Sequence, residues 1–130
     1  MTDDLGKLAL RLTLGVLLLF HGVHKLLNGL EPIRQMLMAH NIPGWAAYGA
    51  YAGELIAPVL IVLGVYARLG GGLVVVNMIV AVALAGTARL LTLGPGGGYG
   101  LELEAFYLFG GLAVALLGSG RLRLGPETWN

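Results

Sequence analysis

Long runs of apolar residues, separated by short polar segments, follow one another along the whole chain. Four of these runs are long enough to cross a bilayer as helices, which takes about 20 mostly apolar residues. They cover residues 8–27, 45–67, 69–91 and 101–118. Lipid offers the backbone no hydrogen-bond partners, so helices are the expected solution. The pattern predicts an all-α protein with one domain, a transmembrane antiparallel four-helix bundle.

The segments between these runs predict two further features. Glu31 and Pro32 suit the start of a helix, and the apolar residues that follow recur at helical spacing. We therefore expect a short interfacial helix between the first two spans. Arg68 and the glycines at 70–72 predict a tight hairpin turn between the second and third spans. On the fourth run, Gly111 lies on a small-residue face that favours close helix packing.

The composition indicates a membrane protein and argues against several other classes of protein. Hydrophobic residues make up 57% of the chain, charged residues 12%, and the mean hydropathy is +0.82. A soluble domain carries roughly 25% charged residues. The absence of cysteine excludes iron–sulfur clusters, thiolate zinc sites and disulfides. A net charge of +1 without a dense basic stretch argues against nucleic acid as a partner, and no haem or flavin site is evident.

The distribution of basic residues predicts the orientation. Five bases fall on the side of the termini and three on the other side. The first group is Lys7, Arg11, Arg68, Arg121 and Arg123, and the second is Lys25, Arg34 and Arg89. The sequence therefore predicts a multi-pass protein of the inner (plasma) membrane with both termini in the cytoplasm.

Ionisable residues inside the predicted spans are the candidates for function, because such residues are costly in a bilayer. His21, His24 and Lys25 lie within an arc of about 100° on the first span. Glu54 lies nine residues into the second span, at a comparable depth in the same outer half. We predict that Lys25 and Glu54 are close enough to pair, since an isolated charge there would be penalised. Their roles are predicted to be catalytic, together with His21.

Other residues extend this predicted pocket as ligand-binding candidates. Tyr51 lies near the face of Glu54, and Arg89 ends the third span. Glu102 and Glu104 begin the fourth span about 200° apart, so only one can face inward; spacing favours Glu104. Pro58 is expected to free the carbonyl of Glu54 from its helical hydrogen bond.

A metal site is a weaker alternative for the same residues. His21, His24 and Glu54 could form a set of two histidines and one carboxylate. Lys25 beside them would compete for the same anion, so we predict no metal. A polar cluster that only fixes the register of the helices remains a second alternative.

The sequence resembles the DoxX family of small four-helix membrane proteins along nearly its whole length. Residues 11–25, RLTLGVLLLFHGVHK, look like the signature of its first helix. Gly53 and Glu54, followed by LGVYAR at 63–68, resemble the second helix, and GSGR at 118–121 resembles the ending. The tail departs from the usual Ser-Leu-Asp ending, and the family's fourth-helix glutamate falls nearer Glu102.

The resemblance implies a membrane component of a redox system, near a quinone. We therefore predict a quinone-linked oxidoreductase subunit that takes electrons from a redox protein partner. Membrane lipid, a quinone or another small hydrophobic ligand, and further copies of the chain are its expected partners. The alternative is a non-enzymatic membrane scaffold or a carrier of small molecules.

Overall fold

The computed structural model describes residues 1–127 and residue 130, and it is helical apart from turns and one isolated bridge between Leu93 and Tyr99. The α-helices are α1 (Thr2–Asn28), α2 (Glu31–Ala39), α3 (Gly49–Tyr51), α4 (Ala57–Leu63), α5 (Ala67–Ala81) and α6 (Glu102–Leu117). Between them lie 3₁₀-helical η1 (Gly44–Tyr48) and η4 (Thr87–Arg89) and π-helical η2 (Ala52–Ile56) and η3 (Val82–Gly86). The all-α class is confirmed.

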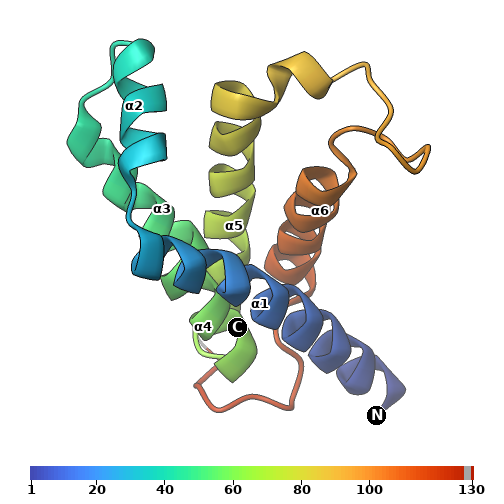
Figure 1. Cartoon of the computed structure of the whole chain (residues 1–130). Helices are drawn as coiled ribbons and strands as arrows, with labels where there is room; N and C mark the ends of the chain where they lie inside the picture. Colours follow the sequence, from blue (N-terminus) through green and yellow to red (C-terminus); the bar gives the residue numbers. More distant parts are fainter. Residues whose placement is uncertain (128–129) are drawn as a thin grey trace.

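The helices pack around one another with α5 in a central position. It contacts both α4 and α6, and α1 lies across α4, η2 and α6. In Figure 1, α5 and α6 stand side by side, and both termini lie in the lower half of the view. The loop that precedes α6, and α2, lie at the top of the same view (Figure 1).

Three helical stretches of the described chain are long and apolar enough to cross a membrane. They are Thr2–Asn28, Gly44–Leu63 and Ala67–Leu84. The first begins six residues before the predicted span, because the mostly polar segment 2–7 is also helical. The second ends earlier than predicted, at Leu63, whereas helical turns continue after Leu84 through η3 and η4 to Arg89. The helix α6, in the fourth predicted run, has 16 residues.

One apolar core joins four of the helices. Its fully or nearly buried members are Leu14 and Leu18 of α1, Ala57 and Ile61 of α4, Ala67, Val74 and Met78 of α5, and Tyr107 and Val114 of α6. Large apolar side chains also cover the outside: Phe106 is 75% exposed and Leu91 is 99% exposed. Such an apolar exterior is suited to lipid, and a membrane protein is the class that this fold defines.

The hairpin between α4 and α5 lies elsewhere than the sequence indicated. The chain reverses at residues 64–66, where Gly64 and Tyr66 have positive φ values of 70° and 49°. The predicted turn at 68–72 is wrong, because Gly70 and Gly71 lie inside α5. A Cβ on Gly71 would come within 2.5 Å of the Gly111 carbonyl oxygen of α6. These glycines permit close helix packing, and the packing role predicted for Gly111 is confirmed.

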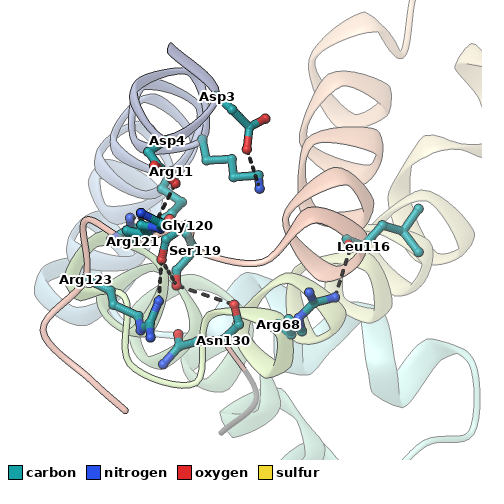
Figure 2. A network of polar contacts seen from close by, with 11 residues as sticks. Asp3, Asp4, Arg11, Arg68, Leu116, Ser119, Gly120, Arg121, Arg123 and Asn130 are labelled. Carbon is teal, nitrogen blue, oxygen red and sulfur yellow. Dashed lines mark hydrogen bonds and ion pairs between the residues drawn. The ribbon is translucent and has the colours of Figure 1, made fainter. Parts of the chain in front are cut away.

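A buried arginine connects α1 to the end of α4 and to the segment that follows α6, in the region of the two termini. Arg11 is 1% exposed and donates hydrogen bonds to four carbonyl oxygens. The acceptors are Ile61 and Val62 at the end of α4, and Ser119 and Leu122 after α6, at 2.6–3.2 Å. Figure 2 shows Arg11 among these terminal segments. We call Arg11 and its four acceptors the arginine clamp.

The predicted helix between the first two spans is present as α2. Pro32 lies in its first turn, and Leu37 is buried against Leu30 and Ala47 in a second, smaller apolar cluster. The helix packs against η1 and η3. Its presence between α1 and η1 is therefore confirmed, while its position at a membrane surface stays a prediction.

Candidate functional site

The buried carboxylate of Glu54 lies on the π-helical turn η2, four residues before Pro58. Proline has no N–H, so the carbonyl of Glu54 lacks the donor that an α-helix would supply. That carbonyl instead faces α1, where a Cβ on Gly22 would collide with its oxygen. The expected release of the Glu54 carbonyl fits this geometry. Isolated π-helical turns are frequent at functional sites.

Lys25 forms an ion pair with Glu54, which confirms the predicted pairing. The ammonium nitrogen of Lys25 contacts Oε2 of the carboxylate. Glu54 is 4% exposed, whereas the Lys25 side chain is 27% exposed. Lys25 follows Gly22 by nearly one turn of α1, so the close approach at Gly22 brings the two charges together. A buried charge in this position is tolerated because it has a partner.

An aromatic contact lies beside the ion pair and joins α1 to α6. The exposed ring of His21 meets Tyr107 edge to face, with centroids 5.8 Å apart and an interplanar angle of 85°. Tyr107 is 7% exposed. Sequence reasoning missed Tyr107. Its spacing of three residues from Glu104 on one helix was the available signal.

A second ion pair connects η4 to the first turn of α6. Nη2 of Arg89 lies 3.0 Å from Oε1 of Glu104, and the guanidinium also donates to the Gly100 carbonyl at 3.3 Å. The Glu104 side chain is 21% exposed, whereas Glu102 is exposed at the surface. Of the two candidate carboxylates, Glu104 is therefore the one turned inward, as the spacing favoured.

The remaining predicted residues make other contacts. His24 is exposed and bonds to Asn28, whose amide nitrogen also donates to the His24 carbonyl. Tyr51 packs against the second apolar cluster and against Tyr48, at a centroid distance of 6.2 Å. Among the residues that the structure describes, no three histidine, aspartate or glutamate side chains gather as a metal site would need. The set of His21, His24 and Glu54 is not assembled.

The polar side chains thus connect several elements of the bundle. Lys25 and Glu54 join α1 to η2, His21 and Tyr107 join α1 to α6, and Arg89 and Glu104 join η4 to α6. Both connections from α1 start on one helix face, since His21 and Lys25 are four residues apart. The fold and this site define a small α-helical membrane protein with ionisable groups among its helices.

The chain belongs to the DoxX family. The sequence model of that family, described as DoxX, matches residues 6–87, which include His21, Lys25 and Glu54. The chain is also similar to a Bacillus subtilis (strain 168) protein named "Putative oxidoreductase CatD". The two are 31% identical over 123 residues, covering 95% of this chain and 87% of the relative. No solved structure matches the chain. The family match and the three long apolar helical stretches indicate a membrane protein.

Proposed function

We propose that this DoxX-family protein is a quinone-linked subunit of a membrane oxidoreductase, with His21, Lys25 and Glu54 at the site that takes the quinone head group. The observation that carries the proposal is the Lys25–Glu54 ion pair, in which a buried carboxylate is joined to a cation that is partly exposed. The oxidoreductase name of the Bacillus subtilis relative supports it.

The side chains fit the chemistry of a quinone head group. A quinone carbonyl accepts hydrogen bonds, and reduction of the ring takes up electrons and an equal number of protons. His21 is exposed and Lys25 is partly exposed, so both offer N–H donors to such a carbonyl. Glu54, behind Lys25, can accept and return a proton. We assign the supply of electrons to a redox protein partner, because the sequence has no evident haem or flavin site and no cysteine to hold an iron–sulfur cluster.

Photoaffinity labelling of the purified chain with a photoreactive short-chain quinone tests this assignment. We expect labelling in the α1 segment that contains His21, competed by an unreactive short-chain quinone. Lys25→Met is expected to raise the dissociation constant about tenfold by removing a charged donor. His40→Gln is the matched control, since His40 is an exposed histidine directly after α2 that bonds to the Met36 carbonyl. Labelling that is equal in His21→Gln, Lys25→Met and the wild type would overturn the proposal.

A membrane scaffold or carrier is the second candidate, and one observation favours it. Lys25, Glu54, Arg89 and Glu104 already satisfy one another in pairs, which is also what a purely structural cluster would show. In that case Glu54→Gln would lower the melting temperature and leave quinone labelling unchanged. In the redox case His21→Gln would weaken labelling while lowering the melting temperature less than Glu54→Gln does, because His21 is exposed and loses only its edge contact with Tyr107.

We propose further that α6 is the fourth span of an antiparallel bundle with both termini in the cytoplasm. Its 16 residues are almost entirely apolar after the first turn, and it packs along α5. The basic residues Arg68, Arg121 and Arg123 gather where the termini meet (Figure 2), as the orientation rule requires of a cytoplasmic side. Reporter fusions after Asn130 are expected to show a cytoplasmic location. A periplasmic signal would reverse the orientation.

A further inference from the structure

One polar group beside the Lys25–Glu54 pair has no role in the function proposed above, the hydroxyl of Tyr107 on α6. The residue is 7% exposed, and its ring belongs to the apolar core of the bundle. Among the residues that the structure describes, no hydrogen bond includes this hydroxyl. Tyrosine hydroxyls usually have a hydrogen-bond partner when the residue is buried. Tyr107 is therefore a polar side chain, more than nine-tenths buried, without a partner in the described chain.

The oxygen of this hydroxyl can still be reached from outside the protein. In the described part of the chain, every fully buried side-chain nitrogen or oxygen has a hydrogen-bond partner. Since the hydroxyl of Tyr107 has none, its oxygen is not fully enclosed, although the residue as a whole is buried. A molecule that approaches the bundle can therefore contact the hydroxyl while the ring stays in the core.

The direction of the side chain brings the hydroxyl toward the level of Lys25. A Cβ on Gly110 would lie 3.2 Å from the side chain of Leu14. One turn earlier on α6, Tyr107 meets His21, so α1 and α6 run in opposite directions along their contact. Long side chains on a helix lean toward the N-terminal end of that helix. From Tyr107 this is the direction of Lys25, because α1 continues from His21 to Lys25.

We propose that Tyr107 is a further binding residue of the quinone site, an inference that rests on the function proposed above. Its O–H donates a hydrogen bond to a carbonyl oxygen of the quinone. A phenol is both a donor and an acceptor, whereas a lysine ammonium is only a donor. The oxygen of Tyr107 therefore also accepts a hydrogen bond from the hydroxyl of the reduced quinol, which Lys25 cannot do. Tyr107 thus allows the site to hold both redox forms of the ligand.

The variant Tyr107→Phe tests this role, because it deletes one oxygen and keeps the ring and its contact with His21. The full chain in detergent is titrated with a short-chain 1,4-benzoquinone, with its quinol, and with the benzene derivative of the same substitution that lacks both ring oxygens. Competition with the photoreactive quinone gives the dissociation constants. We expect Tyr107→Phe to raise those of the quinone and the quinol about fivefold, as for one neutral hydrogen bond. The constant of the benzene derivative should stay unchanged.

Tyr99→Phe is the matched control, because the Tyr99 hydroxyl donates to the Leu90 carbonyl within the segment that precedes α6. It should leave the affinity for the quinone unchanged. Tyr107→Phe itself is expected to unfold at the wild-type temperature, because it removes no hydrogen bond within the described chain. A loss of quinone affinity without a loss of stability is a result that a purely structural tyrosine would not give.

Four results would contradict the inference, and they separate it from the function on which it rests. Equal quinone affinity in Tyr107→Phe and the wild type would overturn the role of Tyr107 and leave the quinone site standing. An equal loss for the quinone and the benzene derivative would show that packing was lost instead of a hydrogen bond. A lower melting temperature in Tyr107→Phe would show that the hydroxyl bonds within the protein. A wild-type chain that binds no quinone would overturn the proposed function together with this role.

Discussion

The arginine clamp and the Lys25–Glu54 pair both place a cation among packed helices, but they satisfy it differently. In the clamp, the guanidinium of Arg11 is almost fully buried and bonds only to backbone carbonyls near the ends of α4 and α6. In the pair, Lys25 is partly exposed and bonds to a carboxylate. The C-terminal ends of α4 and α6 carry the negative end of the helix dipole, which stabilises a cation placed beside them.

This difference separates a structural role from a chemical one. Carbonyl oxygens neither gain nor lose protons, and the clamp joins three segments that are distant in the sequence. A carboxylate can take up a proton, and a partly exposed lysine can move away from it. We therefore expect changes at Arg11 to act on folding, and changes at Lys25 and Glu54 to act on both stability and ligand binding.

The largest effect is expected from Arg11→Met. A buried acceptor left without its donor typically costs about 1–3 kcal/mol, and here four carbonyls would lose their donor. The matched control is Arg68→Met, because Arg68 also donates to two carbonyls, Ala115 and Leu116, but is exposed. We expect the control to lose about 1 kcal/mol or less. Denaturation in detergent measures both changes, and similar losses would show that burial of the clamp is unimportant.

Gly22→Ala is expected to lower the free energy of unfolding by about 1–3 kcal/mol, because the added methyl group meets the Glu54 carbonyl and forces α1 away from η2. The same shift should weaken quinone labelling. Gly6→Ala is the control on the same helix, since a Cβ there meets nothing within 4 Å. We expect it to be neutral or to stabilise the helix by about 0.5–1 kcal/mol. A harmless Gly22→Ala would contradict the close contact.

A double-mutant cycle with Lys25→Met and Glu54→Gln measures the ion pair itself. We expect the stability losses of the two single variants to add up to more than the loss of the double variant. The difference, the coupling energy, should be about 1–2 kcal/mol. The reason is that either single change leaves a charge or a polar group without its partner. Thermal unfolding in detergent gives all four values. Strict additivity would show that the two residues do not interact.

The smallest effect is expected at the second ion pair, Arg89 with Glu104. The Arg89 side chain is 46% exposed, and exposed pairs contribute about 0.2–1 kcal/mol. A cycle with Arg89→Gln and Glu104→Gln should give a coupling in that range, and 1 M salt should reduce it further. A coupling larger than that of Lys25 with Glu54 would reverse the order of the two pairs.

The sequence alone determined the helical class and the approximate spans, because the length of an apolar run and its lack of charge are local properties. It also led to the pairing of Lys25 with Glu54, since both lie at a comparable depth and neither charge is tolerated alone. The α2 helix followed from Pro32 and the helical spacing after it. These features depend on one segment or on a shared depth in the membrane.

Only the tertiary structure decided how the helices meet. From the sequence, Arg11 was predicted only to be one of the basic residues on the cytoplasmic side. In the structure its guanidinium is buried, and its hydrogen-bond acceptors come from the ends of two other helices. Gly70 and Gly71 were predicted to form a turn. In the structure they lie inside α5, where the lack of a side chain lets α4 pack closely at Gly70 and α6 at Gly71. The sequence did not single out Tyr107, whose contact with His21 depends on where α1 crosses α6. Periodicity defines the faces of one helix, but burial and hydrogen-bond partners are set by the docking of distant segments.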